Sequence, residues 1–248
     1  MKKKNTFNND LIYKPGSWKF DTNVAKIFDT HVRKSIPFYD YGHDMIVKFA
    51  NFFLSKDSIV TDIGCSTGTL IKKIHDVQIK KKIGLKYLGI EKEKSMLIRA
   101  KKKLKNIKNI KFINKKIENY KIPKSDLIIS YYTLQFIKPN KRQEILKMIY
   151  NSLNWGGAFI IFEKTRSEDA RFQDLTTQLY HEFKLENGFN GNEIIEKSRS
   201  LIGVLEPFSL SGNSGLLTRA GFKFKKAGFV DSTIIFKNLN FTGFLLIK

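Results

Sequence analysis

Two acidic side chains and a glycine turn occupy positions where a βα unit meets a small molecule. The run Ile59–Ile63 favours a β-strand, the five residues from Gly64 to Gly68 form a turn, and helical spacing follows from Thr69 to His75. Strand, glycine turn and helix together indicate the first βα unit of a doubly wound sheet. Asp62 therefore places a carboxylate at the end of a strand, beside glycines that let backbone approach a ligand closely.

A second acid, Glu91, ends the short apolar run Tyr87–Glu91 about one βα unit later. An acid at this position accepts hydrogen bonds from ribose hydroxyls in nucleotide-binding sheets. Dinucleotide sites need G-x-G-x-x-G, whereas Gly64 and Gly68 have three residues between them, and Asp62 would repel a pyrophosphate. S-adenosylmethionine (SAM) suits the acid better because its amino group and sulfonium are positive. The alternative, a turn that binds nothing, is disfavoured by the register of Glu91.

Length and composition favour one α/β domain with added helices, because 248 residues are enough for a sizeable core. No apolar run approaches the length of a membrane span, and the N-terminal Met1-Lys-Lys-Lys-Asn5 lacks the apolar part of a signal peptide. Cys65 is the single cysteine, so a cytoplasmic protein without internal disulfides is expected. Inside the glycine turn, Cys65 is explained better by its small size than by nucleophilic chemistry.

The formal net charge of +22 permits an RNA-binding surface, because lysines neutralise phosphates and release counterions. The cations are mostly lysine, however, and they accompany heavy use of Ile, Asn and Phe, as in proteins encoded by AT-rich genomes. Aromatic and basic residues are not interleaved in the way that reads bases. Composition is therefore the preferred explanation of the charge, and direct nucleic-acid binding is not expected.

The order of patterns predicts a Rossmann-like α/β fold with a mostly parallel seven-stranded sheet. Residues 1–55 are expected to be a polar arm and two helices, Asp21–Asp29 and Asp44–Leu54, that cap the site. Residues 56–248 are expected to form the SAM-binding part of one structural domain. Alternating strands and helices predict right-handed crossovers; the strands are Ile59–Ile63, Tyr87–Glu91, Ile110–Asn114, Ser125–Tyr132 and Ala158–Glu163, with helices at Thr69–His75, Ser95–Lys105 and Lys141–Leu153.

The alternation breaks after the fifth strand, where two helical patterns follow each other without a strand. They lie at Glu168–Glu186 and Asn192–Leu205 and define a helical insertion over residues 168–205. A helix over Gly212–Ala220 and two closing strands, Phe222–Asp231 and Leu239–Ile247, complete the prediction. A reversed strand near the C-terminus is typical of SAM-binding sheets rather than dinucleotide-binding ones.

Several sequence blocks together are more specific than the glycine turn, which is common to SAM enzymes. They are Phe20–Phe28, Arg33–Tyr39, Asp62–Ser66, Tyr132–Pro139 with Lys141–Gln143, Trp155–Ala158, Phe162–Lys164, His181–Lys184, Asn187–Phe189 and Arg199-Ser200. Through them the chain, from about Phe20 to its end, resembles the carboxy-S-adenosyl-L-methionine (carboxy-SAM) synthases, relatives of the class I SAM methyltransferases.

The resemblance implies an enzyme that takes SAM and prephenate, releases phenylpyruvate, and transfers a carboxylate to the SAM methyl carbon. The sulfonium makes that methyl group acidic enough to lose a proton and capture carbon dioxide. The product would serve a partner enzyme that modifies a wobble uridine in tRNA. The family also implies a homodimer, for which the apolar insertion residues Leu175, Leu179, Phe183 and Leu185 offer a surface.

Site residues follow from the resemblance position by position. Tyr131 and Arg199 are the expected catalytic residues, and Arg199 would pair bidentately with the transferred carboxylate. Ile117 would pack on adenine. The expected SAM-binding residues are Tyr39, Asp62, Gly64, Cys65, Ser66, Glu91, Lys92, Lys116, Ile117 and Tyr131, and no metal ligands are expected.

The chain departs from the family pattern at three positions. Lys116 stands where the family has an acid, Tyr131 replaces an asparagine, and Ser198 precedes Arg199 with a register that leaves either residue at the carboxylate position. Two other functions therefore stay open. One is a conventional SAM methyltransferase acting on a small-molecule acceptor, and the other is a non-catalytic protein that binds nucleotide or tRNA.

Overall fold

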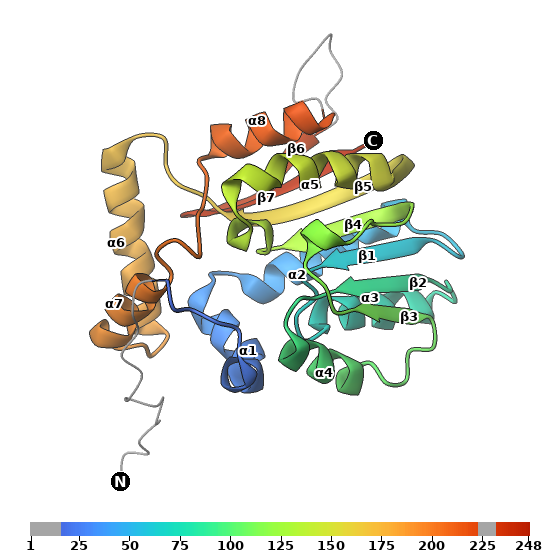
Figure 1. The fold of residues 1–248 in the computed structure, drawn as a ribbon, viewed down its shortest axis with the longest axis horizontal. Helices are drawn as coiled ribbons and strands as arrows, with labels where there is room; N and C mark the ends of the chain where they lie inside the picture. The colour runs from blue at the N-terminus through green and yellow to red at the C-terminus, as the bar shows by residue number, and fades with distance from the viewer. Residues whose placement is uncertain (1–15, 223–231) are drawn as a thin grey trace.

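The computed structural model describes residues 16–222 and 232–248, which are built around one sheet (Figure 1). Its strand order is β3-β2-β1-β4-β5-β7-β6, and all neighbours are parallel except β7, which runs antiparallel to both β5 and β6. The strands are β1 (Ile59–Ile63), β2 (Lys86–Ile90), β3 (Ile110–Ile113), β4 (Ser125–Tyr131), β5 (Leu153–Lys164), β6 (Ser232–Asn238) and β7 (Phe241–Ile247). This arrangement confirms the predicted mostly parallel seven-stranded sheet with a reversed C-terminal strand.

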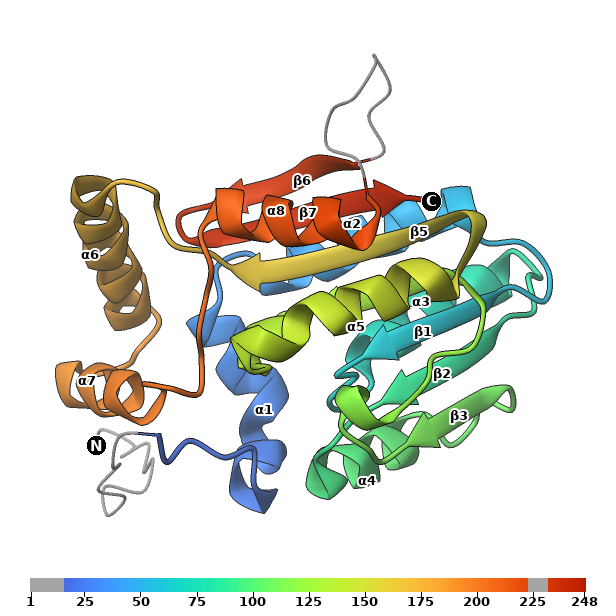
Figure 2. The same cartoon turned by 45° about the horizontal axis from the view of Figure 1, so that its top comes forward.

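Helices cover both faces of the sheet, as a parallel sheet requires. Figure 2 shows α5 (Pro139–Ser152) and α8 (Leu210–Ala220) in front of the sheet, and α2 (Tyr39–Phe53) and α3 (Thr69–Lys80) behind it. Alternate residues of β4 point to opposite faces, so Ile128 joins the core with α5 and α8, whereas Leu127 and Ile129 join the core with α2 and α3. The N-terminal helix α2 thus shares a core with the strands.

The remaining helices lie along the edge where the parallel strands end. They are α1 (Thr22–Ser35), α4 (Lys94–Lys103), α6 (Ala170–Glu186) and α7 (Gly191–Ser200), with short 3₁₀ turns η1 (Ile117–Asn119) and η2 (Leu134–Phe136). Figures 1 and 2 both show α6 and α7 standing beyond the sheet on the same side as α1. Asn190 and Glu193 form a reciprocal capping box that fixes the start of α7.

Several predicted boundaries differ from the structure. The first helix extends to Ser35 rather than ending at Asp29, and the next begins at Tyr39 rather than Asp44, so only residues 36–38 separate the two helices. The second insertion helix ends at Ser200 instead of Leu205. Strand β5 begins at Leu153 rather than Ala158, so the residues between the predicted helix and the predicted strand belong to the strand.

The predicted strand Phe222–Asp231 falls almost entirely outside the described residues. The strand found next to β7 is Ser232–Asn238 rather than the predicted Phe222–Asp231. Among the helices of the described residues, none combines the length and the apolar character that crossing a membrane would need.

Candidate functional site

A cavity of about 580 Å³ opens at the carboxyl ends of the parallel strands, where ligands bind in doubly wound sheets. Asp62 to Gly64 from β1, Glu91 after β2, Tyr131 from β4 and Lys164 from β5 line it in the order of the strands. Residues of α1 and the preceding segment, including Trp18, form the opposite wall. Residues after β3, including Ile117, line the pocket as well, so it extends along the sheet edge from β3 to β5.

The glycine turn brings backbone to the floor of this pocket. Gly64 has a φ of +73°, and a Cβ there would collide with the side chain of Thr133. Ser66 follows with a φ of +51°, a left-handed conformation that is strained for a residue with a side chain. The sharp turn directs the Ser66 N–H towards the second strand, where it meets Glu91.

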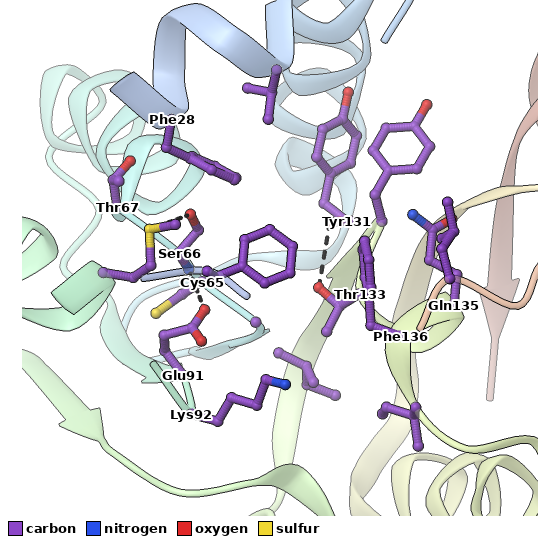
Figure 3. A pocket seen from close by; sticks show the side chains of 18 of the residues that line it. Phe28, Cys65, Ser66, Thr67, Glu91, Lys92, Tyr131, Thr133, Gln135 and Phe136 are labelled. Carbon is purple, nitrogen blue, oxygen red and sulfur yellow. Dashed lines mark hydrogen bonds between the residues drawn. The ribbon is translucent and has the colours of Figure 1, made fainter. Parts of the chain in front are cut away.

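Both carboxylate oxygens of Glu91 are held by backbone amides. The Ser66 N–H donates to Oε2 at 3.0 Å (Figure 3), and the Glu93 N–H donates to Oε1 at 2.9 Å. These bonds favour the ionised form but do not overcome burial, which raises the pKa of Glu91 above its usual value. Each oxygen retains a lone pair, so Glu91 can accept ribose hydroxyls without moving.

Asp62 is buried beside the same turn. Burial, followed by repulsion from Glu91, raises the pKa of Asp62 to about 7. An isolated buried carboxylate is unfavourable, and a cation placed beside it would restore ionisation. This end of the pocket is therefore suited to a positively charged ligand.

Cys65 lies between the two acids, and its thiol is buried. Burial and repulsion from Asp62 and Glu91 raise the pKa of this thiol well above its usual value. The thiol is therefore protonated and unreactive at neutral pH. Cys65 fits its position by size.

Aromatic residues form the middle of the pocket. The Tyr131 hydroxyl donates to the backbone carbonyl of Tyr39 at 2.6 Å, and the two rings meet edge to face at 5.0 Å. His43 packs against both rings from the next turn of α2. Tyr131, the last residue of β4, is thus held against α2 by a hydrogen bond and by ring packing.

The ten residues predicted to bind SAM all line this pocket. Ile117 is buried after β3, whereas Lys92 and Lys116 lie exposed at the rim. The predicted catalytic residue Tyr131 also lines the pocket. Among the described residues, no group of His, Cys, Asp or Glu side chains is arranged to hold a metal ion.

Arg199 is not among the lining residues. Its side chain is 60% exposed on α7, and Nη1 pairs with Glu196 Oε1 at 3.0 Å. Ser198 is exposed as well. Neither of the two residues named for the carboxylate position lines the pocket within this chain.

Two lysines that line the pocket, Lys164 and Lys197, were not predicted as site residues. Lys164 ends the Phe162–Lys164 block, whose strand-end position is a usable signal. Lys197 precedes Arg199 by two residues, which on a helix is a rotation of about 200°. The residue facing the pocket therefore depends on the rotation of α7, which no local pattern fixes.

Known proteins resemble this chain both over one domain and over almost its whole length. A family model described as a methyltransferase domain matches residues 60–157, which span β1 to the start of β5. The carboxy-S-adenosyl-L-methionine synthase of Staphylococcus epidermidis is 37% identical over 237 residues, which cover 95% of this chain and 99% of that protein. This chain belongs to the carboxy-SAM synthase family. The carboxy-SAM synthase of Campylobacter lari is 32% identical to this chain, and the match covers 93% of this chain and 94% of that protein. This second relative supports the same family.

Solved structures show the same fold at much lower identity. An O-methyltransferase family protein from Burkholderia thailandensis matches with a TM-score of 0.64 and 16% identity, over 92% of this chain and 60% of that one. A SAM-dependent methyltransferase from Aquifex aeolicus matches with a TM-score of 0.58 and 15% identity, over 92% and 99%. The predicted class I methyltransferase fold is confirmed, as is the family recognised in the sequence.

Proposed function

We propose that this carboxy-SAM synthase family member is a SAM-dependent transferase that converts SAM to carboxy-SAM. The observation that carries the proposal is the pairing of Asp62 and Glu91 at the ends of β1 and β2, inside a cavity large enough for a nucleoside. Raised pKa values for both acids mark a site that favours a cation, and the full-length family match supports SAM as that cation.

The residues present fit SAM. Glu91 would accept the ribose hydroxyls, and Ile117 would pack against adenine on the β3 side. Asp62 would face the positive groups of the methionine part, which the backbone at Gly64 to Ser66 would border. The bound sulfonium would supply an activated methyl group, and Tyr131 borders the pocket at the neighbouring strand end.

For the second substrate we propose prephenate or another small acid. Prephenate would lose its ring carboxylate and hydroxyl to give phenylpyruvate, the carboxylate would join the methyl carbon, and the displaced methyl proton with the hydroxyl would leave as water. The balance needs no external oxidant or reductant. The product would feed tRNA wobble-uridine modification in the cytoplasm.

A second candidate function is methyl transfer to a small acceptor. It is favoured by Tyr131, because a bulky ring at the end of β4 reshapes the pocket where the family has an asparagine. The tie between the Tyr131 hydroxyl and the Tyr39 carbonyl holds the ring in place and would narrow the choice of acceptors.

Mass spectrometry of nucleotides extracted from the purified protein separates these functions. The proposal expects carboxy-SAM to co-purify with the protein. SAM or S-adenosylhomocysteine alone would favour the methyltransferase. An empty pocket with tight, salt-sensitive tRNA binding would favour a non-catalytic RNA-binding protein.

We also propose that the protein is a homodimer that uses the outer face of α6. Phe172 and Leu175 are 62% and 61% exposed, and Leu179 and Leu185 are each 49% exposed. Phe183, in contrast, packs against the core. Sedimentation equilibrium should give the dimer mass, and Leu175→Glu should shift it to the monomer; a monomeric wild-type protein would contradict this proposal.

A further inference from the structure

The far end of the pocket from Glu91 carries the opposite charge. Lys164 ends β5, Lys184 lies on α6 and Lys197 lies on α7, so three separate elements bring their ammonium groups together. Lys164 and Lys197 line the cavity, and Lys184 is buried behind Tyr180, which also lines it. The acids at β1 and β2 thus face a basic wall built by β5 and the insertion helices.

No carboxylate neutralises this wall within residues 16–222 and 232–248. None of the ion pairs there includes Lys164, Lys184 or Lys197. Aromatic rings lie beside all three ammonium groups instead. The Lys164 and Lys184 ammonium groups lie 4.5 and 4.1 Å from the centre of the Tyr180 ring, and Lys197 lies 5.1 Å from that of Trp18.

The hydrogen bonds of Lys197 also go to neutral groups. Its ammonium contacts the His31 ring nitrogen Nε2 and, at 3.3 Å, the Ser35 hydroxyl. Burial and nearby lysines lower the pKa of His31 to about 3, so the imidazole is neutral at physiological pH. Among the described residues, no acid pairs with the Lys197 ammonium, which is therefore positioned to bind an anion.

Clustering like charges in an enclosed site destabilises the charged form of each group. Burial, then repulsion from Lys184 and Lys164, lowers the pKa of Lys197 to about 7. Burial first and a neighbouring cation second lower the pKa values of Lys164 and Lys184 to about 8. Groups with perturbed pKa values cluster at functional sites, and these three ammonium groups gather at one end of a single pocket.

We propose that Lys197 and Lys164 form a carboxylate-binding subsite, which holds the acidic group of the second substrate and of carboxy-SAM. The proposal rests on the function proposed above, and it assigns to Lys197 the counter-charge that the resemblance gives to Arg199. Each lysine would donate a charge-assisted hydrogen bond to the carboxylate. Lys184, behind Tyr180, would add to the positive potential without touching the ligand.

Calorimetric titration with SAM and with carboxy-SAM tests the subsite. Lys197→Met should weaken carboxy-SAM binding by about tenfold to a hundredfold, the range for one lost charge-assisted hydrogen bond, and leave SAM binding unchanged or slightly tighter. Lys164→Met should act in the same direction. Arg171→Met is the matched control, because it removes a cation from α6 that is 86% exposed and outside the pocket.

A pH series gives a readout that does not depend on the methionine variants folding. The two ligands share their other ionisable groups, so the ratio of their affinities isolates the carboxylate. In the wild type, the affinity for carboxy-SAM divided by the affinity for SAM should fall as pH rises from about 6 to 9, because Lys197, Lys164 and Lys184 lose their protons. Neutral His31 should contribute nothing to this change, and Lys197→Arg should flatten the part near pH 7.

The outcomes separate this proposal from the proposed function. Equal loss of both ligands in a folded Lys197→Met protein would make Lys197 structural and overturn the subsite. Selective loss of carboxy-SAM in Arg199→Met but not in Lys197→Met would overturn it in favour of Arg199. A wild type that binds neither ligand would instead remove the proposed function, and the subsite with it.

Discussion

Glu91 shows how one side chain can be oriented before its ligand arrives. Its two oxygens already accept hydrogen bonds from the Ser66 and Glu93 amides, so the Glu91 side chain is held in place before any ribose binds. Because the carboxylate is already ordered, a new hydrogen bond to it adds to the affinity without a further cost of ordering the side chain.

Glu91→Ala should therefore weaken SAM binding by about 1–3 kcal/mol, the range for a lost hydrogen bond to a charged group. The measurement is calorimetric titration with SAM. Glu93→Ala is the control, since the Glu93 side chain pairs with Lys92 and does not line the pocket. Unchanged affinity in the Glu91 variant would remove the assignment of the ribose site.

Asp62 should make SAM binding depend on pH. With a raised pKa of about 7, the carboxyl is largely protonated at pH 6 in the free protein, whereas a bound cation favours the carboxylate. Binding should release a proton, so SAM affinity should rise as pH rises from about 5.5 to 7, by at most tenfold per pH unit.

Titrations in buffers of different ionisation enthalpy measure this proton release. Asp62→Asn should bind SAM more weakly at pH 7 and lose the pH dependence. Affinity that falls with rising pH across this range in the wild type would contradict the proximity of Asp62 to the ligand's positive charge.

At the scale of residues, the sequence predicts the acidic end of the site but not the basic end. Asp62 and Glu91 follow short apolar strands, and the end of a parallel strand fixes their place at one sheet edge. The position of Lys197 depends on how α7 is rotated against α1, where its ammonium contacts His31. This is a tertiary contact that no local sequence pattern predicts. Arg199, two residues on, consequently faces solvent.

At the scale of elements, α2 and β4 approach each other closely enough to require a glycine. A Cβ on Gly42 would collide with the Tyr131 hydroxyl. The same hydroxyl donates to Tyr39, one turn earlier on α2. The substitution of Tyr131 for the family's asparagine is therefore tied to the packing of an N-terminal helix.

Gly42→Ala should lower the free energy of unfolding by roughly 1–3 kcal/mol, because overpacking outweighs the better helix propensity of alanine. Tyr131→Phe removes the colliding oxygen, so the alanine should cost less in that background; chemical denaturation of the four proteins measures the coupling. Gly191→Ala, at the start of α7 with open space around it, should be nearly neutral. Additive effects of Gly42→Ala and Tyr131→Phe would contradict the contact.

Elements with clear periodicity were predicted well, and those defined by tertiary contacts were not. The five parallel strands were placed within a few residues because buried parallel strands are continuous apolar runs bounded by turns. Strand β6 was missed because Ser232–Asn238 mixes polar and apolar residues at the sheet edge, where it pairs only with β7. The helix α1 was predicted too short because its last two turns are rich in polar residues.

At the scale of the whole molecule, the net charge of +22 does not determine the charge inside the pocket. A pocket that uses acids at one end and lysines at the other does not need the surrounding surface to be basic. Any RNA binding that arises from the surface charge should be weak and independent of sequence.

Any tRNA binding should therefore weaken steeply between about 50 and 200 mM salt and should not compete with SAM. Filter binding at several salt concentrations, with and without saturating SAM, checks this. A tRNA complex that resists salt and is displaced by SAM would move the function towards RNA recognition.

The central claim is that this pocket transfers a carboxylate to SAM. Incubating the protein with SAM and prephenate labelled at the ring carboxylate, then following the label by mass spectrometry, tests it most directly. The account predicts that the label appears in carboxy-SAM, with one phenylpyruvate released for each product molecule. S-adenosylhomocysteine with a methylated acceptor, or phenylpyruvate release without labelled carboxy-SAM, would contradict it.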